Sequence, residues 1–278
     1  MQKAMCHYSF HRRWAAENWD TDRLCEETKA LGVDAIDFHA RLMGDPGTAA
    51  DRIKASLEKS GLILSGLSLS TNFNIEDADE MKAMIDNTIV WMRIATEIGA
   101  PVSRIFGGGL AKEKRTDPQA RKAVLPRIVD ALAEVTKEAE QLGLILALEN
   151  HGGLPCTGEE QVDVIRAIGS PNLKATIDVG NYMAGGQEGA DGTRVAASCC
   201  AYVHFKDYKK APSDATPWGW DTEPCTVGQG DVDHLACLKI LKDAGYDGFV
   251  ALEYEGKEDE RTGVPASVRF MDEVMAGF

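Results

Sequence analysis

The sequence predicts an α/β protein with a single domain, a (β/α)8 TIM barrel over residues 1–278. Short apolar runs alternate with amphipathic stretches along the chain, as successive β-then-α units do. The apolar runs are continuous, which is typical of parallel strands that are buried on both faces. Eight such units in 278 residues favour a closed barrel, which uses about 250 residues. A doubly wound open sheet is the main alternative, but no G-x-G-x-x-G pattern follows the first strand.

The expected elements follow one another without a linker, a repeat or a low-complexity segment. Strands are expected at residues 5–8, 35–38, 62–69, 102–106, 144–148, 173–177, 201–205 and 249–252. Helices are expected at residues 20–31, 47–60, 79–98, 117–142, 158–168, 190–198, 232–244 and 267–275. Asp20 and Asp231 are suitable N-caps for two of these helices. Glycines that directly follow helices are expected to end them: Gly32, Gly61, Gly99, Gly143 and Gly245.

One long segment, residues 207–230, interrupts the alternation and contains three prolines and two tryptophans. A loop of this length in a compact domain is usually either functional or disordered. Because Trp218 and Trp220 lie so close together, we expect this segment to be an ordered lid.

The chain is acidic, with 30 Lys and Arg against 44 Asp and Glu and a formal net charge of −14. This charge excludes binding to nucleic acid, or to an anionic membrane surface, through bulk electrostatic attraction. No apolar run reaches the roughly 18 residues of a membrane span. Residues 1–14 lack the apolar core of a secretory signal, which predicts a cytoplasmic protein.

The seven cysteines are odd in number and form no C-x-x-C pattern. We therefore expect reduced, buried thiols, with Cys199 and Cys200 packed beneath the strand at 201–205.

Ionisable side chains stand at the ends of four consecutive strands: Glu149, Asp178, His204 and Glu253. The carboxyl ends of the strands of a barrel point into its active site, so these four side chains are expected to converge. Three carboxylates and an imidazole at close range would raise one another's pKa values, and a divalent cation relieves that repulsion. Such an oxygen-rich set suits Mn²⁺, Mg²⁺, Co²⁺ or Zn²⁺, with the carboxylates favouring the harder ions. The alternative is that each is a polar strand end bonded to a loop.

Five segments carry a family resemblance: ALENHGG at 147–153, ATIDVGNY at 175–182, YVHFKDY at 202–208, VGQGDVD at 227–233 and ALEYEG at 251–256. They resemble the sugar phosphate isomerase/epimerase family of xylose isomerase-like TIM barrels, which includes ketose 3-epimerases, inosose dehydratase and 3-oxo-glycoside deglycosidases. The resemblance implies that Glu149, Asp178, His204 and Glu253 bind one divalent metal ion, with Mn²⁺ favoured over Mg²⁺, Co²⁺ and Zn²⁺. It also implies that Glu149 and Glu253 move a proton next to a carbonyl through a metal-stabilised enediolate.

Two residues depart from the epimerase pattern. Asn181 stands where epimerases of the tagatose type usually have a histidine, and an amide can bind a substrate hydroxyl but cannot exchange a proton. His151 lies two residues after Glu149, on the same side of the strand if the extended chain continues. A histidine there is suited to acid–base catalysis and could protonate a leaving group, as a lyase requires. Alternatively, it is a loop histidine bonded to the backbone.

Other residues are weaker candidates. Lys206 should face inward, and the resemblance implies that it contacts the substrate. Arg104 could bind a substrate hydroxyl or carboxylate, or could pair with an acidic neighbour. His7, His39 and Asn72 end earlier strands and could line the pocket, and Glu255 could support the site. The run Gly107–Gly109 lacks the Lys and Ser/Thr of a phosphate-binding loop, so we expect a flexible turn.

Four functions are therefore considered. The first is a metal-dependent isomerase or 3-epimerase of a keto-sugar or related polyol. The second is a lyase on the same scaffold, which would dehydrate an inosose or cleave a 3-oxo-glycoside. An abasic-site endonuclease is disfavoured by the charge of −14 and the scarcity of histidines at strand ends, and a non-catalytic sugar-binding barrel is the fourth. The expected partner is a small sugar or polyol, in a homo-oligomer with no nucleic acid and no membrane.

Overall fold

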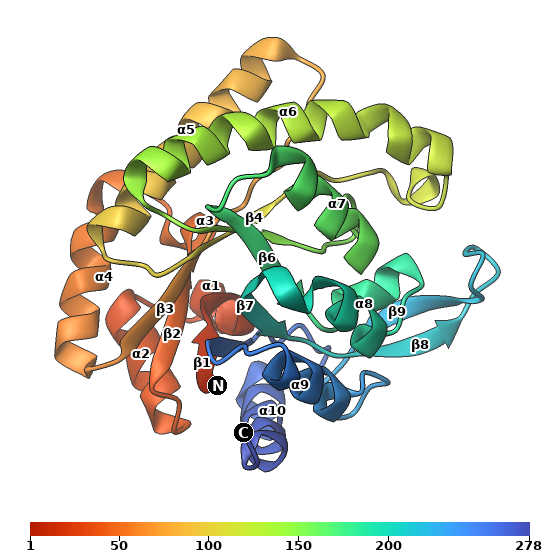
Figure 1. The fold of residues 1–278 in the computed structure, drawn as a ribbon. Helices are drawn as coiled ribbons and strands as arrows, with labels where there is room; N and C mark the ends of the chain where they lie inside the picture. Colours follow the sequence, from red (N-terminus) through yellow and green to blue (C-terminus); the bar gives the residue numbers. More distant parts are fainter.

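The computed structural model describes the backbone of all 278 residues and every side chain except that of Lys112. Eight parallel strands form a closed barrel in the order β1-β10-β7-β6-β5-β4-β3-β2, and helices surround it (Figure 1). The predicted TIM barrel is confirmed.

The structure gives the bounds of every element. The barrel strands are β1 (Gln2–Cys6), β2 (Ala35–His39), β3 (Ile63–Ser68), β4 (Ser103–Phe106), β5 (Leu146–Glu149), β6 (Leu173–Asp178), β7 (Cys200–Phe205) and β10 (Phe249–Leu252). The α-helices are α1 (His11–Ala16), α2 (Thr21–Ala30), α3 (Ala40–Met43), α4 (Pro46–Ser60), α5 (Ala78–Glu97), α6 (Pro118–Leu142), α7 (Gly158–Ile168), α8 (Gly189–Ala196), α9 (His234–Asp243) and α10 (Glu260–Met275). The short 3₁₀ helices are η1 (His7–Phe10), η2 (Lys112–Lys114), η3 (Asn181–Gly185) and η4 (Ala197–Cys199).

The largest differences from the sequence prediction are at the first strand, whose expected residues 7 and 8 lie in η1, and at the starts of two helices. β1 begins at Gln2, because it pairs with β10 from its first residue although Gln2 is exposed. The N-cap of α9 is Asp233, whose carboxylate accepts a hydrogen bond from the backbone N–H of Ala236, and not Asp231. Asp231 instead accepts a hydrogen bond from the backbone N–H of Lys210. α10 begins seven residues before the predicted start because Asp259 caps it, even though the helix contains Pro265.

Inside the barrel, mostly small side chains and one tyrosine form a compact layer: Ala4, Cys6, Ala35, Val102, Ala147, Tyr202 and Ala251. The hydroxyl of Tyr202 lies 2.8 Å from Oγ of Ser65, so its polar end is satisfied. Successive inward positions of a strand are two residues apart. The next inward positions after Ala147, Tyr202 and Ala251 are therefore 149, 204 and 253, which lie above this layer.

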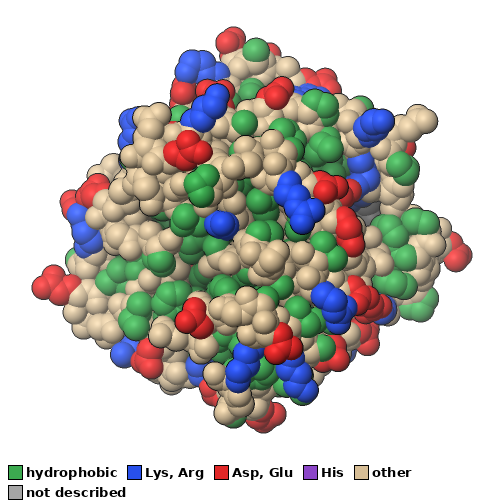
Figure 2. All heavy atoms as spheres, viewed as in Figure 1, with side chains coloured by type: hydrophobic (Ala, Val, Ile, Leu, Met, Phe, Trp, Pro, Cys, Tyr) green, Lys and Arg blue, Asp and Glu red, His purple; other side chains and the backbone are tan. Residues whose placement is uncertain are grey.

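The surface and the thiols agree with the composition. Acidic and basic side chains are interspersed on the face shown in Figure 2. None of the helices described has the length and apolarity needed to cross a membrane. All seven cysteines are free and five are buried. Cys199, at the end of η4, and Cys200, at the start of β7, are only half-buried, so the expectation that both pack beneath the strand was wrong.

The long segment after β7 is ordered. It forms an antiparallel hairpin of β8 (Tyr208–Pro212) and β9 (Trp220–Pro224), in which Tyr208 pairs with Pro224. The carboxylate of Asp207 fixes the returning chain, because it accepts hydrogen bonds from the backbone N–H groups of Gly228 at 2.8 Å and Gly230 at 2.9 Å. The predicted order of this segment is confirmed, and its role as a lid stays a prediction.

The glycine run Gly107–Gly109 lies where two loops cross and pack against each other. Gly108 and Leu154 form an antiparallel bridge in which each backbone N–H bonds to the other carbonyl. A Cβ atom at Gly153 would lie 2.0 Å from the carbonyl oxygen of Gly108, so the two chains approach too closely for any side chain there. This crossing holds the loop that follows β5, which carries His151.

We expect Gly153→Ala to lower the free energy of unfolding by about 1–3 kcal/mol, because the added methyl group overlaps a backbone oxygen. Thermal denaturation followed by circular dichroism measures the change. Gly109→Ala is the matched control, since nothing lies within 4 Å of a Cβ atom at that position. Equal stability of the two variants would contradict the close crossing.

Candidate metal centre and active site

Four ionisable side chains meet at the carboxyl ends of neighbouring strands. Glu149 ends β5, Asp178 ends β6, His204 lies in β7 and Glu253 directly follows β10. One ligand atom from each residue lies within 4.8 Å of those of the others, and all four residues are buried. Nδ1 of His204 is 3.6 Å from Oε1 of Glu149 and 3.5 Å from Oε2 of Glu253. The structure therefore brings together the four residues that the sequence predicts to converge.

Several atoms of this cluster have no hydrogen-bond partner within the described part of the chain. Nδ1 of His204 is buried and has none; Oδ2 of Asp178 and Oε2 of Glu253 also lack a well-aligned hydrogen bond, although the ammonium group of Lys206 lies beside both. Buried polar atoms are almost always hydrogen-bonded, so an unsatisfied imidazole nitrogen that faces two carboxylates requires an explanation. Three carboxylates and one imidazole are a suitable donor set for a divalent cation. These residues could hold a metal ion.

Two buried cations lie against the carboxylates. Nε of Arg104, from β4, is 3.0 Å from Oε2 of Glu149. Nζ of Lys206 is 2.6 Å from Oε2 of Glu253 and 3.3 Å from Oδ2 of Asp178. Arg104 therefore pairs with an acidic neighbour, which is one of the two roles that the sequence predicted for it.

The cations determine how the carboxylates ionise. Burial opposes the charge of Glu149, but Arg104 and His204 hold its pKa well below the usual range. Burial likewise opposes the charge of Glu253, and Lys206 and His204 lower its pKa strongly. Burial dominates at Asp178 and raises its pKa to about 7 despite Lys206.

The imidazole responds in the opposite direction. Burial opposes protonation of His204, but the carboxylates of Glu253 and Glu149 raise its pKa well above the usual value. A cation bound at Nδ1 would replace that proton and satisfy the same carboxylates.

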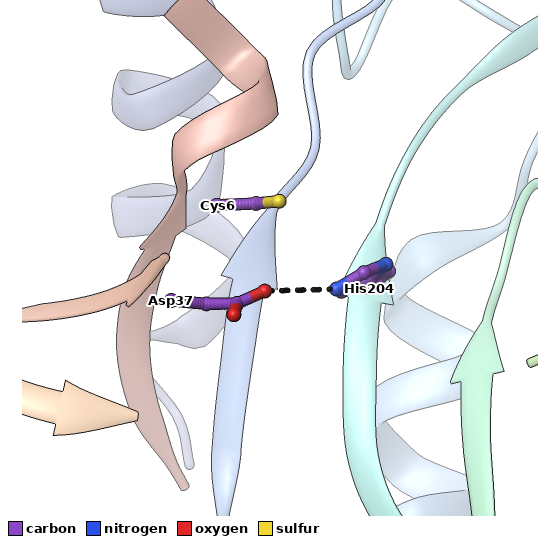
Figure 3. Close-up of side chains that lie close together, drawn as sticks. All are labelled: Cys6, Asp37 and His204. Atoms are coloured by element: carbon purple, nitrogen blue, oxygen red, sulfur yellow. Dashed lines mark ion pairs between the residues drawn. The ribbon is translucent and has the colours of Figure 1, made fainter. Parts of the chain in front are cut away.

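The far side of His204 faces a carboxylate from β2. Nε2 of His204 lies 3.6 Å from Oδ2 of Asp37, which also accepts a hydrogen bond from the Ser68 hydroxyl at 2.6 Å. In Figure 3 the two side chains point toward each other across the barrel, with Cys6 beside them. A carboxylate behind a ligand histidine fixes the tautomer and orientation of the ring. Sequence reasoning missed Asp37 and Cys6, and the only available signal was one carboxylate inside an apolar strand.

Asn181 connects the cluster with the hairpin. Its Nδ2 donates to Oε1 of Glu149 at 3.1 Å, and its Oδ1 accepts from the Tyr208 hydroxyl at 3.1 Å. Nδ1 of His151 is 3.3 Å from Nδ2 of Asn181 and 3.8 Å from Oε1 of Glu149. The side chain of His151 is 47% exposed, so it stands at the solvent side of the buried cluster.

The weaker candidates are placed differently. His7 is buried and packs on Trp14 with ring centroids 4.3 Å apart, and burial lowers its pKa to about 3. His39 is also buried, and its backbone N–H donates to Nδ1 of His7. Asn72 is exposed, and its Oδ1 accepts from the backbone N–H of Gly109, so it organises the glycine crossing. Glu255 lies 3.4 Å from Nζ of Lys206 and supports that ammonium group.

Comparisons with known proteins agree with this architecture. The model of the xylose isomerase-like TIM barrel family matches residues 25–274. Inosose dehydratase of Geobacillus kaustophilus is 21% identical over 259 residues, which cover 86% of this chain and 81% of that protein. D-psicose 3-epimerase of Enterocloster bolteae is 22% identical over 264 residues, which cover 88% and 81%. An uncharacterized protein of Methanocaldococcus jannaschii is 28% identical over 142 residues, 49% of this chain, and this match spans 45% of that protein.

Solved structures show the same fold at low identity. The 3-keto-D-glucoside 4-epimerase of E. coli superposes with a TM-score of 0.76 at 13% identity and covers 99% of both chains. A xylose isomerase-like TIM barrel protein from Mycobacterium smegmatis, solved in complex with magnesium, superposes with a TM-score of 0.71 at 17% identity, covering 92% of this chain and 88% of that one.

We expect Mn²⁺ at about 100 times its dissociation constant to stabilise the folded protein by about 2.7 kcal/mol, because the ion binds only the assembled cluster. The melting temperature should therefore rise by roughly 5 °C when Mn²⁺ is added to protein that was first dialysed against a chelator. Glu253→Gln should abolish the shift, and Asp37→Asn should weaken binding by about 10- to 100-fold through the loss of ring orientation.

The control is Glu223→Gln, which removes an exposed carboxylate on β9 that pairs with Lys257. It should leave the shift unchanged. If Glu253→Gln retained the full shift, the four residues would not be the metal ligands.

Proposed function

Because this chain belongs to the xylose isomerase-like TIM barrel family, we propose that it is a metal-dependent isomerase or epimerase of a keto-sugar or related polyol. The observation that carries the proposal is the buried cluster in which two glutamates flank one histidine, 3.6 and 3.5 Å from its Nδ1. The epimerases and the dehydratase among the relatives act on sugars or polyols by name.

Glu149, Asp178, His204 and Glu253 would hold the ion, and Mn²⁺ is our choice because carboxylates dominate the donor set. When bound, a divalent ion supplies Lewis-acid polarisation of a carbonyl and its neighbouring hydroxyl. The magnesium found in the Mycobacterium smegmatis structure makes Mg²⁺ the first alternative.

The two glutamates move the proton. Both stay ionised at neutral pH because Arg104 and Lys206 hold their pKa values low. Either carboxylate can therefore accept a proton from the carbon next to the carbonyl. In an epimerisation, the other side chain returns a proton to the opposite face of that carbon.

The same two cations favour the intermediate. Removal of a proton next to a carbonyl leaves negative charge on the sugar oxygens. Arg104 and Lys206 are already buried and fixed by their carboxylate partners. Such fixed positive charge stabilises developing negative charge without reorganisation. Lys206 thereby fits the substrate-binding role implied by the family, and Arg104 acts on the substrate through Glu149.

A lyase is the second candidate, and the position of His151 favours it. The imidazole lies 3.8 Å from Glu149 and is half-exposed, so it can reach the edge of a bound sugar. A protonated imidazole there would donate to a departing hydroxyl or alkoxide after the first proton has been removed. Asn181 would orient the same part of the sugar through its amide. Cytoplasmic location and a homo-oligomeric state stay predictions.

We expect Glu149→Gln and Glu253→Gln each to reduce turnover by at least about 100-fold, because each variant lacks one proton carrier. The assay is proton NMR in D₂O with ketohexoses, inososes and 3-oxo-glycosides. An isomerase or epimerase places deuterium on the carbon beside the carbonyl, and a lyase releases water or an aglycone.

Glu223→Gln is the control, since that carboxylate pairs with Lys257 and lies outside the cluster. It should retain most of the activity. If Glu149→Gln or Glu253→Gln exchanged the proton beside the carbonyl at the wild-type rate, the two-glutamate mechanism would be excluded.

We expect His151→Gln to separate the two candidate reactions. If His151 protonates a leaving group, the variant should lose about 100-fold on alkyl 3-oxo-glycosides and little on nitrophenyl 3-oxo-glycosides, whose leaving group needs no proton. Release of the aglycone measures both rates. An equal loss of rate on the alkyl and nitrophenyl substrates would contradict the role of His151 as an acid. If the variant epimerises a keto-sugar at the wild-type rate and neither protein releases an aglycone, the protein is an isomerase.

A further inference from the structure

A cavity of about 480 Å³ lies beside the β8–β9 hairpin. Three segments line it: the loop that precedes α6, the short helix η3 and the tip of the β8–β9 hairpin. We call it the outer cavity, and its lining includes Arg115, Met183, Thr216, Trp218 and Trp220. Figure 2 shows hydrophobic side chains gathered on the hairpin, at the right edge of the molecule. A volume of several hundred Å³ is usual for a small-molecule site.

Two of the segments that line the outer cavity also carry or contact residues beside the metal centre. Met183 is two residues beyond Asn181, which donates to Glu149. In addition, Arg115 lies against the loop that carries His151, because a Cβ atom at Gly152 would be 3.4 Å from Nη1 of Arg115. The half-exposed His151 is therefore near both the buried cluster and a residue that lines the outer cavity.

The two tryptophans are held in place before any ligand binds. The ring of Trp218 packs on the backbone of Gly186, where a Cβ atom would lie only 2.5 Å from ring carbons. The ammonium group of Lys210 lies 4.5 Å from the centroid of the Trp220 ring. Nε1 of Trp220 is buried and has no hydrogen-bond partner among the described groups. This fixed aromatic wall therefore also contains an unused N–H donor.

The lining favours a neutral ligand with both an apolar face and hydroxyl groups. Aromatic rings bury flat apolar surface, and a few polar groups then fix orientation. Among the described lining residues, Glu113 and Asp221 contribute two carboxylates and Arg115 contributes one guanidinium group. This excess of negative charge disfavours a polyphosphate ligand. A pyranose ring has this chemistry, because its C–H groups form an apolar face and its hydroxyls lie around the edge.

We propose that the outer cavity binds the second sugar ring of a glycoside whose keto-sugar ring occupies the metal centre. This inference rests on the proposed function and narrows its substrate class to di- or oligosaccharides. The bond between the two rings then lies beside His151. The tryptophans determine affinity for the outer ring, and the metal centre determines the reaction.

Binding is tested first with unreactive sugars. Isothermal titration of the Mn²⁺-loaded enzyme with cellobiose, maltose and glucose should show tighter binding of at least one disaccharide than of glucose. Trp218→Ala and Trp220→Ala should each weaken disaccharide binding by about tenfold or more. Trp218→Phe keeps an aromatic ring and should retain most of the affinity. Trp91→Phe is the matched control, because Trp91 lies in α5, outside the lining.

Catalysis gives an independent readout. Trp218→Ala should raise KM for 3-oxo-cellobiose or 3-oxo-maltose and leave proton exchange on 3-oxo-glucose unchanged. Glu149→Gln should show the reverse, in that exchange is lost and the tryptophan-dependent preference for a disaccharide over glucose is kept. If wild type binds neither disaccharide more tightly than glucose, or if Trp218→Ala binds like wild type, the inference is wrong. Tryptophan-dependent binding without any proton exchange would support the outer site and refute the proposed function.

Discussion

The structure depends on the mutual compensation of buried charges at the carboxyl ends of the strands. An ionised carboxylate without a partner costs several kcal/mol to bury, so three in one place are tolerated only with cations beside them. Arg104 and Lys206 supply those cations from β4 and from the chain after β7, at 3.0 and 2.6 Å from Glu149 and Glu253. The barrel is suited to this arrangement because every parallel strand delivers its last inward side chain to the same end.

The four cluster residues could be predicted because two simple periodicities place them. Parallel strands end at one face, and inward positions recur every second residue. Asp37 could not be found in this way, because its partner His204 is distant in sequence and only closure of the barrel brings β2 and β7 to face each other. The pairing of Arg104 was also left open, since a sequence does not show whether a buried cation meets a substrate or a neighbouring carboxylate. Helix ends were predicted well where a glycine follows, as at Gly143, which has φ of +65°.

The hairpin shows what a local pattern cannot predict. Neither β8 nor β9 alternates apolar with polar residues, so the sequence indicated order only through its tryptophans. The order comes from tertiary contacts, in which Asp207 binds the returning backbone and Trp218 packs on Gly186. These contacts need glycine at positions 186, 228 and 230, whose role becomes visible only in the folded chain. Asp207 therefore explains the glycines of the segment at 227–233, which had no chemical role in the sequence.

One stretch of chain connects the reaction with substrate selection. His204 and Lys206 act in the cluster, Asp207 anchors the loop and Tyr208 begins the hairpin while its hydroxyl binds Asn181. The first residue of the hairpin is therefore hydrogen-bonded to Asn181, whose amide donates to Glu149. Both candidate reactions begin with the same proton removal next to a carbonyl, and the outcome depends on which groups meet the next carbon–oxygen bond. In the proposed reaction those groups would be His151 and Asn181, which lie beside Glu149.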